Sequence, residues 1–372
     1  AYRLCLQFAP AYPDAWNNLG LAQATLGDQQ AAMASYRQAL SIDAAFKPSR
    51  QNLAQALVQN RQHQEALDHF ETLTQQDLSV PEQVVALQGR VNCLLELDRY
   101  DDALALADRA EDRRVQLMQR VHVLPILFHD DGQVATIRER WHADLRELYS
   151  LLEDLSIDDP AWEVLYAHGW SITNFYLAYQ MEDDRALQEL YAGVLDRVLR
   201  PRVGRFMQPL PPREPDDQSP IRVGVISPHL HNHNGSIWCL GWLEGLADRP
   251  EFSIYSYNIA DREDSGTERF AALGAYRHLP LRADDPEPML QQIIDDRLDL
   301  LIYTDIGMHP ASKVVSVLQL APVQALGWGH PITSGSRTIQ YFFGAEGMEP
   351  PGNEAHYSEA LIRLPATGLN YT

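Results

Sequence analysis

A repeat of 34 residues is the feature that most restricts how this chain can fold. Ala32 and Tyr36 recur one period later as Ala66 and Phe70. A unit of this length cannot bury its own apolar face, so successive units must stack to form one core. Small residues such as Gly20 let two antiparallel helices approach closely. The repeat therefore predicts a helical solenoid at the start of the chain.

A period of 34 residues is that of the tetratricopeptide repeat. Tyr36 and Ala39 correspond to Tyr2 and Cys5 one period earlier, so the sequence opens in the second helix of a unit. We therefore expect the start to be truncated, and we assign residues 1–112 to the array. A third, degenerate unit follows the two clear ones.

Stacked repeats of this kind form a curved superhelix, and its concave face holds extended peptides. The expected partners of the array are therefore proteins or peptides. The side-chain amides of Asn17, Asn18 and Asn52 are candidates for gripping a peptide backbone. A purely structural role, as a spacer or a dimer contact, is the alternative.

Residues 113–200 keep a helical periodicity but lose the repeat. Ile137, Trp141 and Leu145 follow one another at intervals of four, which predicts a second helical layer. The aromatic run from Trp170 to Gln180 is interpreted as a buried helix that packs rather than binds a ligand. Six prolines between residues 201 and 220 exclude regular helix and favour an extended connector, so we place a domain boundary there.

From residue 221 to residue 372, short β-rich runs alternate with helical segments. This rhythm predicts an α/β domain with a doubly wound, Rossmann-like sheet of parallel strands. Ligands of such sheets bind beyond the carboxyl ends of the strands. The expected strands are residues 221–227, 252–259, 276–281, 298–304 and 323–328, and the expected helices include residues 238–246, 288–296 and 312–318.

Histidine is concentrated in the loops that follow the first, fourth and fifth expected strands. This concentration favours an acid–base or polar-substrate site. The HxHxH spacing in the first loop also fits zinc, but no cysteine or carboxylate cluster completes such a site, so no metal is expected. The last loop is either a structural turn or a cleft wall that offers hydroxyls and backbone N–H groups to an anionic or sugar ligand. Five of the 13 histidines lie in these loops: His229, His231, His233, His309 and His330.

Composition and missing motifs exclude several classes of protein. The net charge of -21 and the absence of a basic stretch argue against a nucleic-acid partner. No apolar run reaches the ~20 residues of a membrane helix. Neither GxGxxG nor GxxxxGK[ST] occurs, which disfavours a dinucleotide oxidoreductase and a P-loop ATPase. Three cysteines without CxxC spacing lead us to expect a reducing, cytoplasmic setting.

Four stretches of the α/β region resemble the catalytic region of protein O-GlcNAc transferases, particularly the bacterial and SPINDLY-like members. Their order and spacing are more specific than any one of them alone. The tetratricopeptide array and residues 174–179 are similar to the same family, so the resemblance spans nearly the whole chain. The stretches are residues 221–227 with 232–233, residues 299–302 with 305–308, residues 320–325 with 328–335, and residues 348–350 with 356–359.

The resemblance implies that residues 221–372 are the N-terminal, acceptor-side lobe of a GT-B glycosyltransferase. The activity it implies is inverting, metal-independent and cofactor-free transfer of GlcNAc from UDP-GlcNAc to Ser or Thr of protein acceptors held by the repeats. The second lobe, which binds the nucleotide sugar in this family, is missing, so we expect the chain alone to be inactive. O-fucosyl or N-glucosyl transfer within the family is one alternative. A noncatalytic repeat scaffold with a degenerate transferase half is the other.

The same resemblance identifies His233, which follows an asparagine in the loop after the first strand, as the catalytic candidate. Its imidazole either accepts the proton of the acceptor hydroxyl or positions the acceptor, and an unperturbed pKa of about 6.5 suits both tasks. The other residues expected in the cleft are Asn232, Asp305, Gly307, His309, His330, Pro331, Thr333, Ser334 and Gly335.

Overall fold

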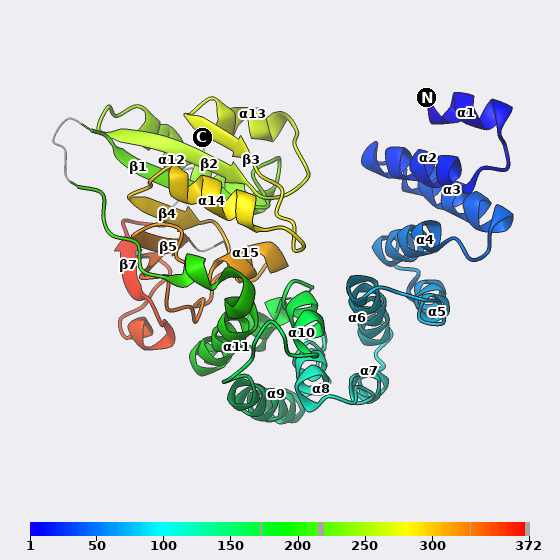
Figure 1. The fold of residues 1–372 in the computed structure, drawn as a ribbon. Coiled ribbons are helices and arrows are strands. Elements are labelled where there is room, and N and C mark those ends of the chain that lie inside the picture. The colour runs from blue at the N-terminus through cyan, green and yellow to red at the C-terminus, as the bar shows by residue number, and fades with distance from the viewer. Residues whose placement is uncertain (172, 215–218, 328, 369–372) are drawn as a thin grey trace. The chain divides into compact units, whose positions relative to one another are not determined.

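The structure is a computed structural model that describes residues 1–171, 173–214, 219–327 and 329–368. The chain divides into two compact units, Ala1–Asp131 and Gly132–Thr372 (Figure 1), which we call the repeat unit and the sheet unit. Ile172 in the aromatic run, Pro215 in the connector and Trp328 at the end of the fifth expected strand lie outside the described residues.

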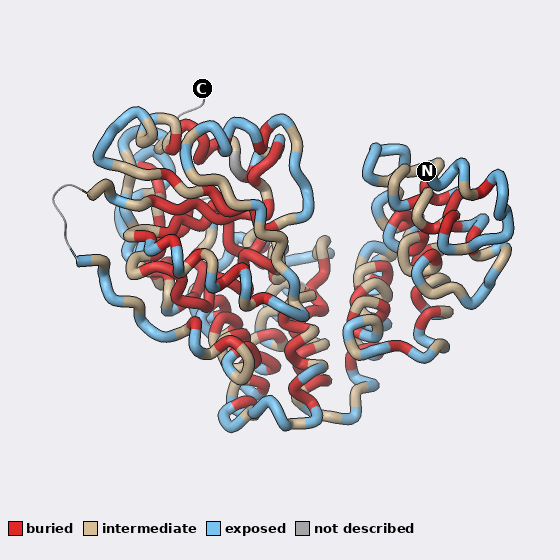
Figure 2. Tube along the Cα trace, turned by 45° about the horizontal axis from the view of Figure 1, so that its top comes forward, coloured by how far each residue is buried: buried red, intermediate tan, exposed pale blue. Residues whose placement is uncertain are grey.

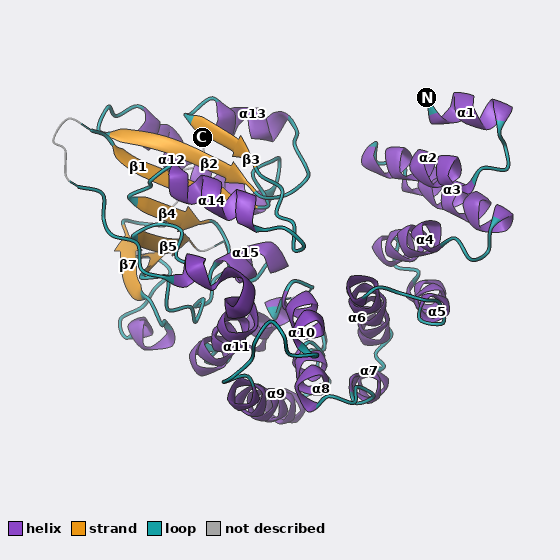
Figure 3. Ribbon diagram, in the orientation of Figure 1, coloured by secondary structure: helices purple, strands orange, loops and turns teal. Residues whose placement is uncertain are grey.

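The repeat unit consists of helices that pack in consecutive pairs, α2 with α3, α4 with α5 and α6 with α7 (Figure 3). A Cβ atom on Gly20 would overlap the ring of Tyr36, and one on Gly89 would overlap the ring of Phe70. These glycines therefore allow the close approach that the repeat predicts. The helices are α1 (Tyr2–Phe8), α2 (Pro13–Thr25), α3 (Gln29–Ile42), α4 (Lys47–Gln59), α5 (His63–Leu73), α6 (Val80–Glu96), α7 (Tyr100–Ala107) and α8 (Arg113–Val121).

Asn17 does not present its amide to a peptide. Its side chain is buried, and its Oδ1 atom accepts hydrogen bonds from Ser49 Oγ at 3.0 Å and from Asn52 Nδ2 at 2.9 Å. These two bonds join α2 to α4. The role of gripping a peptide backbone, predicted from the sequence, is therefore wrong for Asn17. The side-chain amide of Asn52 also uses one of its N–H donors within the repeat unit. Asn18 is half-buried, and its contact with a peptide stays a prediction.

The sheet unit begins with a helical layer. Trp141 in α9 and Tyr191 in α11 are fully buried, and their ring centroids lie 5.9 Å apart, which confirms the predicted helical packing. Pro201 lies inside α11 rather than in an extended connector; so close to the end of a helix, a proline removes one backbone hydrogen bond without breaking a longer run. The elements are α9 (Asp131–Leu151), α10 (Trp162–Gly169), η1 (Phe175–Gln180), α11 (Arg185–Val203) and η2 (Gly204–Met207).

The parallel sheet predicted from the sequence is present, with the strand order β3-β2-β1-β4-β5-β6-β7. Val225 of β1 is fully buried and lies between Ser256 of β2 and Ile302 of β4. Figure 2 shows buried residues along the strands, where the core of this unit lies. The strands are β1 (Ile221–Ser227), β2 (Phe252–Asn258), β3 (Ala275–His278), β4 (Leu300–Tyr303), β5 (Val323–Gly327), β6 (Tyr341–Ala345) and β7 (Ala360–Leu364).

Strands β6 and β7 are missing from the sequence-based prediction. β6 contains Gly344, which weakens a strand signal, and β7 is only five residues long, is interrupted by Arg363 and has every residue partly or fully exposed. The remaining elements are α12 (Asn234–Ala247), α13 (Ser265–Ala271), α14 (Glu287–Asp295), α15 (Pro310–Val315) and η3 (Asn353–His356). Among the described residues, no helix is both long and apolar enough to cross a membrane.

Candidate functional site

The winding of the sheet reverses between β1 and β4. The chain runs outward from β1 through β2 to β3 and then returns to place β4 on the other side of β1. Ser227 Oγ, at the end of β1, donates a hydrogen bond to Asp305 Oδ1 at 3.4 Å, and Gly329 N–H donates to Thr304 O at 3.1 Å. The loops after β1, β4 and β5 therefore meet at the switch point, which is where open α/β sheets bind ligands.

Four of the five predicted histidines form one cluster at this point. The rings of His229 and His233 stack with their centroids 4.2 Å apart, and His309 meets His229 edge-on at 6.0 Å. The ring centroid of His231 lies 5.4 Å from that of His233. Burial lowers the pKa of all four, to about 3 for His229. The cluster is therefore neutral at pH 7.

His233 has a defined tautomer because it caps a helix. It precedes α12, and its Nδ1 atom accepts a hydrogen bond from Gly235 N–H at 3.0 Å. A ring nitrogen that accepts a hydrogen bond carries no proton, so neutral His233 holds its proton on Nε2. The ring therefore offers a hydrogen-bond donor at Nε2 rather than a lone pair.

His309 repeats this arrangement on the loop after β4. It caps α15, and its Nδ1 atom accepts from Ala311 N–H at 3.1 Å. Its proton is therefore also on Nε2. The half-buried ring of His229 contacts both capping rings, His233 by stacking and His309 edge-on, so two donors of the same kind lie next to one imidazole.

The loop that carries His233 is held by the start of α13. Asn232 N–H donates to Asp264 Oδ1 at 2.9 Å, and Asn232 Nδ2 donates to Ser265 Oγ at 2.9 Å. A Cβ atom on Gly266 would come within 2.5 Å of Asn232 N. Asn232 thus anchors the loop through its own donors. Sequence reasoning missed this support, although the capping box of α13 from Asp264 to Thr267 is a readable signal.

Asp305 joins the loops instead of facing a ligand. Its side chain is fully buried, and it accepts hydrogen bonds from the hydroxyls of Thr304 at 3.1 Å and Ser312 at 3.1 Å, besides that of Ser227. Burial raises the pKa of this carboxyl to about 6. The geometry gives Asp305 a structural role where a substrate contact was expected.

His330 lies beneath the loop after β4, outside the cluster of four. It is 1% exposed, and its Nδ1 atom donates to Ile306 O at 3.2 Å. A Cβ atom on Gly307, whose φ is +120°, would lie 2.7 Å from that nitrogen, so only glycine fits there. Burial lowers the pKa of His330 to about 4. His330 is therefore a buried, neutral support of the loop.

Phe175 stacks on His330, with ring centroids 5.1 Å apart. The prediction of a buried helix from Trp170 to Gln180 is wrong, because α10 ends at Gly169 and residues 175–180 form a 3-10 turn. Residues i and i+3 eclipse in such a turn, which places Tyr176 and Tyr179 on one edge, and they are 38% and 65% exposed. The segment thus belongs to the surroundings of the site.

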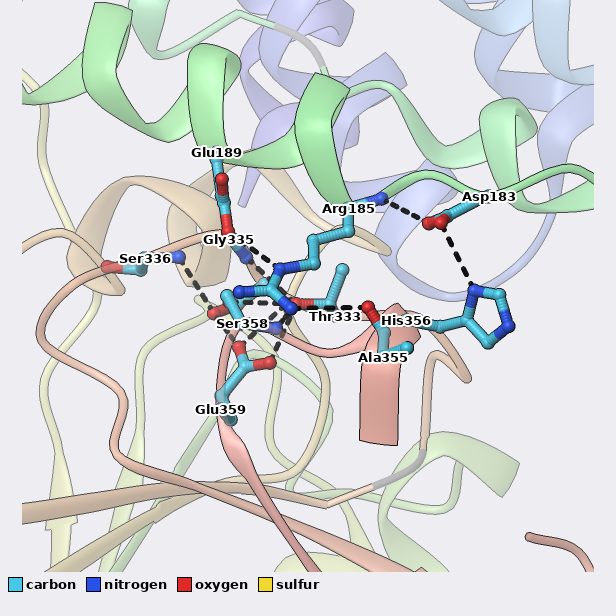
Figure 4. A network of polar contacts seen from close by, with 11 residues as sticks. Asp183, Arg185, Glu189, Thr333, Gly335, Ser336, Ala355, His356, Ser358 and Glu359 are labelled. Carbon is cyan, nitrogen blue, oxygen red and sulfur yellow. Dashed lines mark hydrogen bonds and ion pairs between the residues drawn. The ribbon is translucent and has the colours of Figure 1, made fainter. Parts of the chain in front are cut away.

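The hydroxyls of the loop after β5 are engaged inside the protein (Figure 4). Thr333 Oγ1 donates to Glu359 Oε2 at 2.7 Å, and both the N–H and the hydroxyl of Ser334 donate to Glu359 Oε1. Both residues are almost fully buried. The turn interpretation therefore fits Thr333 and Ser334 better than the cleft-wall interpretation.

Pro331 is exposed, whereas Thr333 and Ser334 are buried. Pro331 and Ile332 border a cavity of about 470 Å³ that Met181 and Asp183 also line. Of the residues predicted in this loop, Pro331 alone stays open to a ligand in the described part of the chain.

Comparison with known proteins supports the resemblance seen in the sequence. Residues 13–46 and 52–115 match models of the tetratricopeptide repeat. The chain is 26% identical over 164 residues to the "Probable UDP-N-acetylglucosamine--peptide N-acetylglucosaminyltransferase SPINDLY" of Arabidopsis thaliana, which covers 42% of this chain and 17% of that protein. It is 28% identical over 159 residues to the "UDP-glucose:protein N-beta-glucosyltransferase" of Actinobacillus pleuropneumoniae, covering 42% of this chain and 24% of that protein.

The fold is that of a solved bacterial transferase. A mutant of the Thermobaculum terrenum O-GlcNAc transferase matches 97% of this chain with a TM-score of 0.53 at 20% identity, and the match covers 58% of that structure. The chain thus spans about a sixth of the length of SPINDLY and little more than half of the solved transferase. These likenesses confirm a repeat array followed by a transferase-like α/β fold.

Proposed function

We propose that this chain is the acceptor-side part of a glycosyltransferase that moves GlcNAc from UDP-GlcNAc to Ser or Thr side chains of proteins. The observation that carries the proposal is the position of His233, at the switch point between β1 and β4 and with its proton on Nε2. The similarity to SPINDLY and to a bacterial O-GlcNAc transferase supports the choice of donor and acceptor.

In the proposed reaction the acceptor hydroxyl attacks the anomeric carbon of the sugar. The new bond from oxygen to carbon forms as the bond from that carbon to the diphosphate breaks, UDP leaves with the bonding electrons, and the hydroxyl proton passes to water. Attack from the face opposite to the diphosphate inverts the anomeric centre. Neutral His233 donates through Nε2–H to the acceptor oxygen and orients it, since a protonated nitrogen cannot accept the hydroxyl proton as well.

The proposal includes no metal and no cofactor. A histidine binds a metal through an unprotonated nitrogen, and in His233 and His309 that nitrogen is Nδ1, which already accepts a helix-capping hydrogen bond. Metal binding to either ring would therefore remove a cap. We also place the reaction in the cytoplasm, because Cys5, Cys93 and Cys239 are all free thiols.

The repeat unit supplies the protein partner in this proposal. Tetratricopeptide arrays bind extended segments along their concave face, so the repeats would hold the acceptor protein while the sheet unit acts on one side chain. Transfer of glucose to a nitrogen of a protein, with Asn as the acceptor, is the second candidate, because the Actinobacillus relative is named a UDP-glucose:protein N-beta-glucosyltransferase.

The test is a transfer assay with the product of the complete reading frame. UDP-GlcNAc, UDP-glucose and GDP-fucose are offered separately with a pool of protein acceptors, and glycopeptides are sequenced by mass spectrometry. GlcNAc on Ser or Thr is the expected product. Glucose on Asn supports the second candidate, and fucose on Ser or Thr assigns a different donor. If no sugar is transferred from any donor, the chain is a noncatalytic scaffold and the proposal fails.

A further inference from the structure

Lysine is rare in this chain, and one of its two lysines is buried beside the candidate site. Of 30 basic residues, only Lys47 and Lys313 are lysines. Lys313 lies in α15 and is 2% exposed. Burying an ammonium group is costly unless hydrogen bonds and an opposite charge compensate it.

The ammonium group of Lys313 joins three parts of the sheet unit. Nζ donates to Ser334 O at 2.8 Å, in the loop after β5, and to Gln188 Oε1 at 2.9 Å, in α11. It also lies 5.4 Å from the ring centroid of Tyr191, a favourable position for a cation. One side chain of α15 thus ties the loop to the helical layer.

Glu359 also binds Ser334, through the polar groups of Ser334 that Lys313 does not contact. The carboxylate is 5% exposed and accepts from the N–H and the hydroxyl of Ser334, whereas Lys313 bonds the carbonyl of Ser334. A buried cation and a buried anion therefore meet at one residue. We call Gln188, Lys313 and Glu359 the loop clamp.

The backbone next to the loop clamp packs closely against α11. Gly335 has a φ of +68°, and a Cβ atom there would overlap the backbone of Gln188. Ser336 Oγ donates to Ser316 O at 2.7 Å, just after α15. The loop after β5 is therefore pressed against α11 and α15 by contacts that begin at Ser334.

We propose that Lys313 and Glu359 are positioning residues that hold the loop from His330 to Ser336 in its working shape before substrate binds. The inference rests on the proposed function, because that loop meets the loop after β4 at the switch point where His233 lies. Burying two opposite charges usually adds little stability over apolar side chains of similar size. Its benefit here is geometric, since a charge on each side of Ser334 selects one orientation of that peptide group.

In the described part of the chain, three titratable side chains act on or face Lys313: Glu359, His330 and Tyr191. Burial lowers the pKa of Lys313 to about 7, and Glu359 opposes this shift. His330, on the loop, has its pKa lowered first by burial and also by Lys313, and Tyr191 faces the ammonium from α11. The charge of Lys313 is therefore balanced chiefly by Glu359.

The first experiment tests the loop clamp by NMR and does not depend on enzymatic activity. With [13Cε]lysine, this 372-residue chain gives two lysine signals, and Lys47 serves as the internal reference in a pH titration. We expect Glu359→Gln to lower the pKa of Lys313 by about one unit and Gln188→Glu to raise it, because each changes the negative charge near Nζ. A Lys313 signal that titrates together with that of Lys47, or that ignores both substitutions, overturns the clamp.

The second experiment measures catalysis in the protein from the complete reading frame. Lys313→Met and Glu359→Gln should each lower kcat about tenfold at unchanged KM, and the double variant should be no worse than the poorer single one, because both act through Ser334. In the wild type, kcat should also change across the pKa of Lys313 measured by NMR, and Lys313→Met should abolish this step. Arg282→Met, at an exposed position, is the control with unchanged kcat.

The outcomes separate the two proposals. If the wild type transfers sugar and Lys313→Met keeps a normal kcat and pH profile, the clamp has only a structural role and the inference is wrong. If the wild type transfers no sugar, the proposed function fails, and amide exchange at Ser334 then judges the clamp. Exchange at least about tenfold faster in Lys313→Met supports it, and unchanged exchange refutes it.

Discussion

The backbone N–H of Gly235 donates to Nδ1 of His233 at 3.0 Å, and this bond fixes where the proton of the imidazole lies. The same ring thus caps α12 and presents Nε2–H at the switch point of the sheet. Two functions that are usually assigned to separate residues meet in one side chain, and substitutions can separate them.

His233→Asn keeps a good helix cap but removes the imidazole donor, whereas His233→Ala removes both. We expect both variants to lose roughly 100-fold in turnover, because misplacement of the acceptor carries a cost of that order. Only the alanine variant should lose about 1 kcal/mol of stability. Sugar transfer and urea unfolding measure the two effects. Full turnover in the asparagine variant would show that His233 is a cap and no more.

Gly335→Ala tests the contact between the loop after β5 and α11. The position has a φ of +68° and no space for a Cβ atom, so we expect a loss of about 2–4 kcal/mol in the free energy of unfolding. Gly245→Ala is the matched control, since its Cβ atom would meet nothing within 4 Å; in α12 it should be neutral or stabilise by up to about 1 kcal/mol. Equal behaviour of the two variants in urea unfolding would contradict the packing at Gly335.

Asp305 predicts a pH dependence of stability. Burial raises its pKa in the folded protein to about 6, above the value of about 3.9 in an unfolded chain. Between these values the folded state binds more protons, so Asp305 contributes stability at pH 4 that is lost as the pH rises through 6. Asp305→Asn should remove this part of the decrease in the free energy of unfolding with rising pH, which amounts to up to about 3 kcal/mol. Asp284→Asn, at an exposed position, is the control, and a wild-type-like pH profile in Asp305→Asn would sink the prediction.

Phe175→Ala tests whether the 3-10 turn seals His330. The two rings stack at 5.1 Å, and burial keeps the pKa of His330 near 4. Removing the phenyl ring admits water, so the pKa of His330 should rise toward its ordinary value. Tyr179→Ala, 65% exposed in the same turn, should leave it unchanged. NMR titration of His330 decides, and an unmoved pKa in Phe175→Ala contradicts the assignment.

Asn17 and Asn18 are neighbours that should respond differently to alanine. Asn17 accepts two hydrogen bonds between α2 and α4, so Asn17→Ala should lower the stability of the repeat unit by about 1–2 kcal/mol. Asn18→Ala should leave stability unchanged and weaken acceptor binding. Thermal unfolding and acceptor titration check the pair, and a large loss of stability in Asn18→Ala would remove Asn18 from the list of peptide contacts.

Local periodicity was enough to predict much of this fold. The 34-residue repeat and the alternation of strands and helices after residue 221 are properties of neighbouring residues, and both are present in the structure. The meeting of the loops with His233 and His309 also followed, because parallel strands bring their carboxyl ends to one edge of a sheet. Edge strand β7 was not predicted because it is only five residues long and is interrupted by Arg363.

Tertiary structure alone revealed the roles of several polar residues. Asp305 reads as a ligand contact, and no local pattern marks Lys313 as buried, until the segments around them are in place. Lys313 meets Ser334 and Gln188, and Phe175 meets His330, across 21, 125 and 155 positions of the chain. Whether a polar group is buried and paired depends on which distant segments surround it, and no local pattern records that. The helical solenoid and the parallel sheet were therefore readable in the amino-acid order, whereas the loop clamp required the folded chain.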